Sequence, residues 1–297
     1  MVTLDDPVTT WSAALVPQID RLALCIHRPT GRRPDLVAAL RPLGLPPHSF
    51  VVAAARCLAA GELTLDDVCL LSRYESKRWS EASLRRHLER GLLSLRSDGV
   101  TYVPTPGFQA GAGTVLALQA EEAERLWHAR PAALEDALRL ASLLVQEASG
   151  SHRPLPAFRQ QTRAHHVLPS TDAGQLLGYM TELRYLRSDV HADCLAGVEL
   201  VGPPARVLHR LWRGFPPGSA TPEVLDVLAG RGLVAGPEDG SQWTITGQGR
   251  HLCQTVEEAT NVDFGQLFHS VSEPDRGALL AAVAQLDGED PRPVEDR

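Results

Sequence analysis

The chain reads LERGLLSLRSDGVTYVPTPGF from Leu88 to Phe108, and this pattern occurs twice in the sequence. The second occurrence, LAGRGLVAGPEDGSQWTITGQG, begins at Leu228. Both contain Arg-Gly-Leu followed by a turn sequence, and in both a threonine lies fifteen residues after the arginine. A pattern that returns in this form predicts two copies of one structural unit.

Each residue type in the repeat has a local structural meaning. A glycine directly after a helical segment ends the helix in the left-handed conformation. Asp-Gly marks a hairpin turn, and a threonine caps the helix that follows it. The glycines are Gly91 and Gly232, the turns are 97–99 and 238–240, and the caps are Thr105 and Thr246. Each copy is therefore expected to contain a helix, a β-hairpin (at about 93–104 and 233–245) and another helix. This is the second half of a winged helix domain.

Helical segments are also expected on both sides of each copy. They lie near residues 11–27 and 110–127 for the first copy, and near 173–197 and 248–264 for the second. Their apolar stripes need a partner, and the nearest partner is the other copy. The expected fold is mainly α with small β-hairpins, in which tandem winged helix-turn-helix-like units form an internal pseudo-dimer.

The length of the chain allows two ordinary domains. Residues 1–149 are expected to form the first winged unit with its flanking helices, and 150–286 the second, diverged unit. A linker is expected at 150–156, where Gly, Ser and Pro cluster. Residues 287–297 are charged and interrupted by proline, which predicts a disordered tail.

Composition narrows the class of protein. Apolar residues make up 43% of the chain and charged residues 22%, as in ordinary globular proteins. No apolar run suits a membrane helix, the N-terminus lacks a signal-peptide pattern, and the five cysteines form no CxxC pair. These features predict a cytoplasmic protein with no membrane partner and no cofactor. The net charge of −7 argues against binding nucleic acid by bulk attraction but permits a local basic patch.

A helix-turn-helix arrangement is expected just before the first hairpin. Thr64 can cap a short helix that runs to Leu71, and residues 72–78 would form the turn. A second helix is expected to begin at Trp79 or Ser80 and to end at Gly91. On it, Leu84 and Leu88 are four residues apart, which places both on the face toward the core.

The opposite face of that second helix is basic. Around it lie Arg73, Arg85 and His87, which with the candidates below make the densest basic stretch of the chain, partly offset by Glu81 and Glu89. Arginines bind phosphates and guanine edges, and small side chains allow close approach to the major groove. The candidate DNA-binding residues are Lys77, Arg78, Ser83, Arg86, Arg90 and, on the wing, Arg96.

Residues Leu63–Pro106 resemble the helix-turn-helix and wing of MarR-type regulators. In this resemblance Leu65–Cys69 corresponds to the first helix, Ser80–Arg90 to the recognition helix and Arg96–Tyr102 to the wing. The second half is similar to winged-helix proteins found in actinobacteria. MarR-type proteins carry one unit per chain and dimerise, whereas this chain has two. The resemblance implies a DNA-binding transcriptional regulator with double-stranded DNA as its partner, and leaves open a small-molecule effector and a homodimer.

The second copy differs from the first in length and charge. From Gly61 to Arg90 is 29 positions, but from the comparable Gly214 to Arg231 is only 17, so about one short helix and its turn are missing. Its remaining helix carries Glu223 and Asp226, which would repel phosphate. The second copy is therefore expected to pack or to bind a ligand, rather than to read DNA.

A polar set on the segment 173–197 gives a candidate ligand site. Its members are Arg184, Tyr185, Arg187, Asp189 and His191. They indicate either salt bridges between helices or a pocket for an anionic ligand between the two halves. In MarR-type regulators such a pocket lies between the dimer helices and the winged domain. His165 and His166 are adjacent and point in different directions, so no metal site is expected there.

Three functions stay open at this point. The first is a sequence-specific DNA-binding regulator that responds to a ligand. The second is a small-molecule-binding or sequestering protein, for which an aromatic-lined cavity near Trp127, Trp212 or Tyr185 would be evidence. The third is an enzyme on a winged-helix scaffold, which is disfavoured because no GxSxG, P-loop, HExxH or complete GxGxxG motif occurs. No catalytic residue is assigned.

Overall fold

The computed structural model describes residues 6–30, 34–43, 57, 60–218, 220–236 and 242–287, and it is mainly helical with two small antiparallel sheets. The first half contains α1 (Pro7–Thr30), α2 (Pro34–Leu43), β1 (Leu63–Thr64), α4 (Leu65–Leu71), α5 (Lys77–Glu89), β2 (Leu93–Leu95), β3 (Thr101–Pro104), α6 (Pro106–Trp127) and α7 (Pro131–Ser149). The second half contains α8 (Pro156–Arg163), the 3-10 turn η1 (His165–Val167), α9 (Asp172–Gly197), α10 (Gly202–Trp212), α11 (Pro222–Gly230), β4 (Val234–Ala235), β5 (Thr244–Ile245), α12 (Gly247–Gln266) and α13 (Glu273–Asp287).

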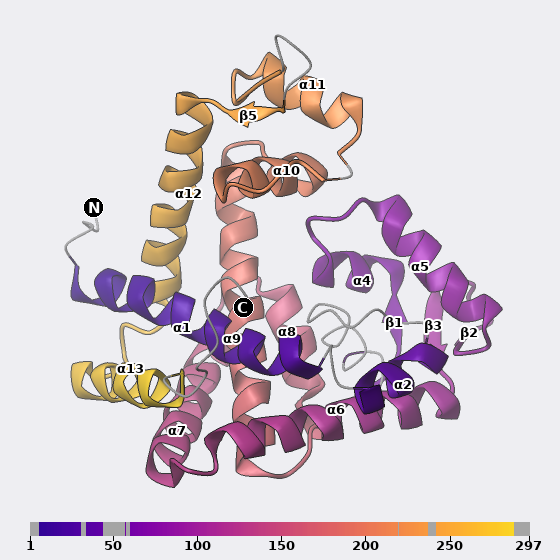
Figure 1. Cartoon of the computed structure of the whole chain (residues 1–297), viewed down its shortest axis with the longest axis vertical. Helices are drawn as coiled ribbons and strands as arrows, with labels where there is room; N and C mark the ends of the chain where they lie inside the picture. The colour runs from indigo at the N-terminus through magenta and orange to yellow at the C-terminus, as the bar shows by residue number, and fades with distance from the viewer. Residues whose placement is uncertain are drawn as a thin grey trace.

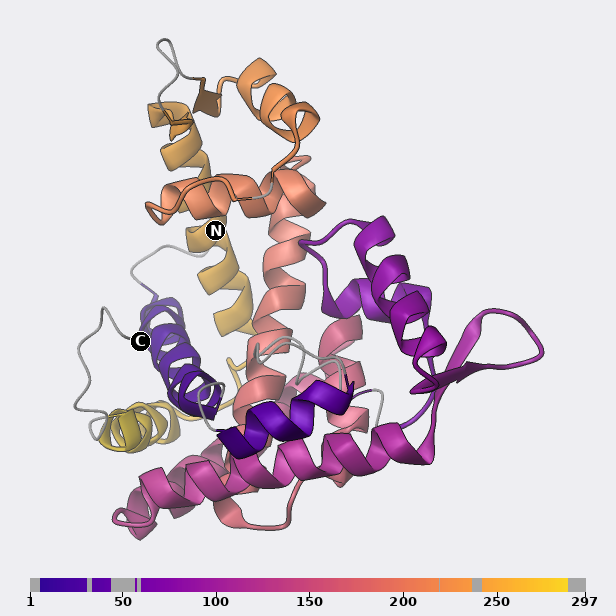
Figure 2. The ribbon, with the colours of Figure 1, turned by 45° about the vertical axis from the view of Figure 1, so that its right-hand side comes forward.

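The long helix α9 runs through the middle of the molecule, and two units project from it (Figure 1). The first unit, residues 63–105, consists of α4, α5 and the sheet β1-β3-β2. The second unit, residues 202–246, consists of α10, α11 and the β4-β5 hairpin. Both hairpins lie where the sequence predicts them. Figure 2 shows the β2-β3 hairpin extending away from the helical body.

The two units share the hydrogen bonds that the repeat predicts. Gly91 and Gly232 both have a positive φ, of 67° and 69°. Thr105 accepts a hydrogen bond from the Phe108 amide and donates its own amide to the Leu92 carbonyl. At the corresponding place the Thr246 hydroxyl accepts from Gly249 and the Thr246 amide donates to Leu233. The glycine stop and the threonine cap are thus confirmed in both units.

Other boundaries depart from expectation. Helix α5 begins at Lys77 rather than at Trp79 or Ser80, because Ser76 caps it by accepting a hydrogen bond from the Trp79 amide. The helices α7, α8 and α13 have no counterpart among the predicted segments. The second predicted turn, at 238–240, and residues 288–297 of the predicted tail lie outside the described residues.

Helices from both halves form the main hydrophobic core. It contains α1, α7, α9, α12, α13 and the last turns of α6, with Leu15, Leu140 and Leu183 among its fully buried side chains. Hydrogen bonds cross the halves: the Trp11 indole donates to the Arg276 carbonyl over 2.9 Å, and the Ser12 hydroxyl to the Asn261 carbonyl over 2.7 Å. The N-terminal helix is therefore part of a core that the C-terminal helices complete.

Each unit also has a smaller core, which neighbouring helices complete. In the first, Val68, Leu84 and Phe108 pack together, so Leu84 faces inward as predicted. In the second, Leu208, Leu228 and other apolar residues of α9 to α12 do the same. The described residues between α10 and α11 contain no helix, in agreement with the shorter spacing in the sequence.

We expect Gly249→Ala to destabilise the protein by about 1–3 kcal/mol, which is typical of overpacking. A Cβ at this position would overlap the Leu233 carbonyl oxygen and lie 2.8 Å from Cγ1 of Ile245. Two residues earlier in the same helix turn, a Cβ on Gly247 would meet nothing within 4 Å. Gly247→Ala is thus the matched control, and thermal unfolding of both variants checks the difference. Equal melting temperatures would contradict the close approach of α12 to the hairpin.

Candidate nucleic-acid interface and adjoining cavity

Local hydrogen bonds order the start of α4 and join its end to α5. Thr64 and Asp67 form a reciprocal capping box at the start of α4, with the Thr64 amide 2.8 Å from Asp67 Oδ2. The Ser72 hydroxyl lies 3.0 Å from the Ser80 hydroxyl, which joins the end of α4 to the first turns of α5. Both serines are buried, so this contact is protected from competing water.

Helix α5 has one buried and one exposed face. Ser80, Leu84 and His87 are buried, and Leu88 packs against the same core. His87, which the sequence counts in the basic stretch, does not belong to the exposed face, because its ring lies against Phe108 and its Nδ1 is 2.7 Å from the Ser83 carbonyl. Ser83 is only partly exposed.

The exposed face of α5 carries arginines without acidic partners. Arg78, Arg85, Arg86 and Arg90 are exposed, and in the part of the chain that the structure describes none of them forms an ion pair. Lys77 lies 3.3 Å from Asp66, with both side chains largely in solvent. An exposed guanidinium with no carboxylate partner keeps its five donors available for phosphate or base edges.

The wing adds one further cation beside this face. Arg96 follows β2, is exposed, and pairs with Glu62 just before β1. The wing turn is ordered by Asp98, which accepts hydrogen bonds from Thr101 and Val100. These bonds lower the pKa of Asp98, and the bond from the Thr101 hydroxyl has the largest effect. Asp98 is therefore ionised at the tip of the wing.

Three consecutive residues of the turn between α4 and α5 attach the first unit to the rest of the protein. Arg73 pairs with Asp189 of α9, Tyr74 packs against the core of the second unit, and Glu75 pairs with Arg206 of α10. Arg73, which the sequence counts in the basic stretch, does not add to the exposed basic surface, because its guanidinium points inward to α9. The turn is thus held by both the central helix and the second unit.

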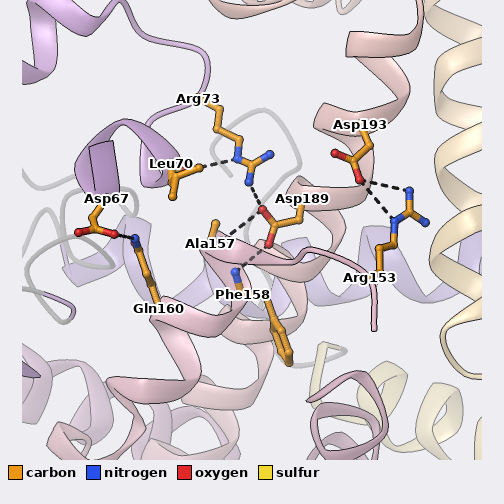
Figure 3. Close-up of polar contacts among 9 residues, drawn as sticks. All are labelled: Asp67, Leu70, Arg73, Arg153, Ala157, Phe158, Gln160, Asp189 and Asp193. Atoms are coloured by element: carbon orange, nitrogen blue, oxygen red, sulfur yellow. Dashed lines mark hydrogen bonds and ion pairs between the residues drawn. The ribbon is translucent and has the colours of Figure 1, made fainter. Parts of the chain in front are cut away.

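Asp189 is the centre of this attachment (Figure 3). Its side chain is 1% exposed and accepts hydrogen bonds from Arg73 and from the amides of Ala157 and Phe158, at 3.3 and 2.9 Å. Burial raises the pKa of Asp189, and Arg73 and the two amides oppose that effect. Nearby, Gln160 donates to Asp67 over 2.8 Å and so joins α8 to the cap of α4.

A cavity of about 930 Å³ lies beside this turn, between the two units. Its walls come from α1, α6, α9, α10, α12 and the α4-α5 turn, including residues 71–75 and Trp79 at the start of α5. Trp212 and Tyr185 are among its lining residues, whereas Trp127 is buried in the main core. The cavity therefore touches the element that positions α5.

Four of the five candidate ligand residues line this cavity: Arg184, Tyr185, Arg187 and His191. The fifth, Asp189, does not, since it is buried under Arg73. The salt bridges expected as the alternative are also present: Arg184 lies 2.7 Å from Asp20 of α1, and Arg187 pairs with Glu257 of α12. The ion pairs and the cavity thus occupy the same face of α9.

Two polar side chains at the end of the cavity near α12, His191 and Tyr74, are neutral at pH 7. Burial lowers the pKa of His191 to about 4, against the opposing charge of Glu257, and its Nδ1 lies 3.0 Å from the Thr260 hydroxyl. Burial raises the pKa of Tyr74 to about 12. Charge in the cavity therefore comes from its arginines and carboxylates.

The exposed face of α11 in the second unit is unlike that of α5. Glu223, Asp226 and Val227 are exposed, and the helix contains no lysine or arginine. Arg231, the counterpart of Arg90, donates hydrogen bonds to the carbonyls of Val198 and Glu199, each over 2.8 Å. Its guanidinium stabilises the end of α9 instead of facing solvent.

Other polar clusters do not form a second candidate site. Both ring nitrogens of His165 are engaged, by Glu182 and Gln175 at 2.6 Å each, while His166 is exposed. Among the described residues, no group of three or more His, Cys, Asp or Glu side chains is arranged to hold a metal ion. None of the helices that the structure describes is long and apolar enough to span a bilayer.

Comparison with known proteins identifies one family. The model of a helix-turn-helix family matches residues 100–289, from the wing of the first unit to α13. No curated protein and no solved structure matches the chain. The matched span is almost two thirds of the sequence and contains the whole second unit, α6 and the central helix α9.

Asp189→Asn is expected to lower the free energy of unfolding by about 3 kcal/mol, because it leaves the Arg73 guanidinium without its partner in a largely buried place. The control lies one turn along on α9. Asp193, 46% exposed, meets Arg153 at 3.4 Å, and Asp193→Asn should cost less than about 1 kcal/mol. Urea unfolding of the two variants measures the difference. Similar midpoints for both would show that the buried pair does not hold the turn.

Proposed function

We propose that this chain, which belongs to a helix-turn-helix family, is a sequence-specific DNA-binding transcriptional regulator whose reading head is α5 with the β2-β3 wing. The observation that carries the proposal is the exposed row of arginines on α5, none of which has an acidic partner among the described residues. On a chain of net charge −7, such a row is a local exception that suits a polyanionic partner.

The geometry suggests a role for each cation. Arg86 and Arg90 lie one helical turn apart on the face opposite Leu84, and would enter the major groove. Lys77 and Arg78, at the start of the helix, would meet the backbone, and Arg96 on the wing would meet phosphate. The half-exposed Ser83 gives the small side chain that close approach requires.

The finer proposal is a tandem arrangement of MarR-like type. The shared stop, cap and hairpin bonds support two copies of one unit, and the common core of α1, α9, α12 and α13 supports an internal pseudo-dimer. Because α11 is acidic, one chain would carry a single reading head. Tight binding would then require two chains on a two-fold site.

The second candidate function is small-molecule binding or sequestration. The cavity beside the α4-α5 turn favours it, since about 930 Å³ falls in the range of ligand sites and aromatic side chains line it. The two functions are compatible in a ligand-responsive regulator, where Arg184, Tyr185, Arg187 and His191 would face the ligand. Asp189 would then act only by holding Arg73.

We expect the double variant Arg86→Ala/Arg90→Ala to bind DNA far more weakly than wild type. Each base-reading arginine contributes about 1–3 kcal/mol, and each lost phosphate contact lowers the salt slope by about one. The measurement is fluorescence anisotropy at two salt concentrations, with a labelled duplex from the region upstream of the protein's own gene.

The control is Arg163→Ala/Arg250→Ala, which removes the same charge from exposed positions away from α5. Its affinity and salt slope should match wild type. Glu223→Gln/Asp226→Asn, on α11, should also leave binding unchanged if the second unit does not read DNA. Equal binding by the α5 variant and wild type, or no salt-dependent binding by wild type, would refute the regulator.

The pseudo-dimer makes a separate prediction about folding. If the chain is divided between Gly150 and Ser151, each half loses the partner for its long helices, so neither should fold alone. Co-expressed halves should purify together, with circular dichroism like that of the intact chain. Two halves that are each soluble, monomeric and fully folded would contradict the internal pseudo-dimer.

A further inference from the structure

We propose that the cavity between the two units binds an amphipathic organic anion, whose acid group lies on Arg210 and Arg213 of the α10 side and whose apolar body lies between α1, α6 and α9. This inference deepens the second candidate function by giving the ligand a chemical class. Only its regulatory part rests on the proposed DNA binding.

The charges that line the cavity do not balance. Seven lining residues are arginines, against three carboxylates, Asp20, Glu75 and Glu257. Five of the arginines have a carboxylate partner: Arg21 with Asp287, Arg73 with Asp189, Arg184 with Asp20, Arg187 with Glu257, and Arg206 with Glu75. Arg210 and Arg213 have none among the described residues. The surplus of two positive charges predicts an anionic occupant.

The two surplus arginines share one face with a third. Arg206, Arg210 and Arg213 follow one another at spacings of four and three, and therefore lie along one side of α10 and its C-cap. Arg210 is oriented by a 3.0 Å hydrogen bond to the Pro216 carbonyl and by the Phe215 ring, 5.9 Å from its centroid. That bond uses Nε, which leaves the terminal nitrogens available for an acid group.

Apolar side chains also line the cavity. Among them are Pro17 of α1, Leu168 in the segment before α9 and Tyr185 of α9, each of which keeps part of its surface accessible. An inorganic anion would leave these walls in contact with water, whereas an apolar body on the same ligand would cover them. A site with apolar walls and a cationic edge therefore suits an organic acid better than free phosphate or sulfate.

Such a ligand would also contact the support of α5. Residues 72–75 and Trp79 line the same cavity, and Glu75 pairs with Arg206 on the face that carries the two surplus arginines. An acid group beside Arg206 competes with Glu75 for that guanidinium. Binding would thereby change how the turn is held, and so the affinity of α5 for DNA. Bound DNA would then change the affinity for the ligand by the same factor.

Two dyes with the same ring systems test the class of ligand without DNA. The first is 8-anilinonaphthalene-1-sulfonate, an amphipathic anion, and the second is N-phenyl-1-naphthylamine, which lacks the sulfonate. Wild type should bind one sulfonate dye per chain, with energy transfer from Trp79 and Trp212. Arg210→Ala/Arg213→Ala should raise the Kd for the sulfonate dye by about tenfold or more, because charged hydrogen bonds are lost. The Kd for the neutral dye should stay unchanged.

Two further variants keep the result interpretable. Arg210 packs on the loop that follows α10, so Arg213→Ala alone, at an exposed position, gives a variant in which no described side-chain hydrogen bond or ion pair is lost. Arg163→Ala/Arg250→Ala controls for net charge and should bind both dyes as wild type does. The inference is overturned if the sulfonate dye shows no saturable binding to wild type. It is also overturned if the α10 variants lose affinity for both dyes in parallel, or if the charge control loses as much affinity for the sulfonate dye as they do.

The regulatory part has its own readout. Saturating sulfonate dye should shift the Kd for the duplex, and the α10 variants should need more dye for the same shift. An unchanged Kd would overturn the coupling. Absence of DNA binding would instead refute the proposed regulator while the dye titrations still decide the anion site, so the two failures are distinguishable.

Discussion

The buried carboxylate of Asp189 is the interaction on which the arrangement of the units depends. A charge at 1% exposure is tolerated only when every available oxygen has a donor, and here Arg73 and two amides of α8 supply them. The helix-turn-helix of the first unit, the start of α8 and the middle of α9 therefore meet at one point. Any rearrangement of the turn must keep these donors or leave the carboxylate unpaired.

This attachment determines what the second unit can influence. Tyr74 enters the core of the second unit, and Glu75 pairs with Arg206, so α10 contacts the turn that positions α5. The cavity shares the same turn as one wall. Trp79 of α5 also lines the cavity, so the cavity borders both the turn and the helix that the turn positions.

Local features could be predicted from the sequence, and long-range contacts could not. Gly91, Thr105 and their counterparts act through bonds within a few residues, so their residue types reveal the hairpin units and the helix ends. The inward direction of Arg73 depends on a partner 116 positions away, and nothing in its neighbourhood distinguishes it from the exposed Arg78. Asp189 was grouped with the ligand candidates for the same reason: its spacing on α9 is helical, but only packing shows that Arg73 covers it.

On the proposed function, the differences between the two units have one physical explanation. A reading head must expose cations and a pre-formed turn, which costs stability unless other segments support the turn. The first unit exposes arginines on α5, and its turn is supported by α9 and α10. The second unit lacks that turn, uses Arg231 to bind the end of α9, and presents acidic side chains outward. Its basic side is instead the one that faces the cavity. Because the arginines of α10 face the cavity, they are not placed to contact phosphate. On the proposal above, they supply the positive charge that would bind the acid group of a ligand beside the α4-α5 turn.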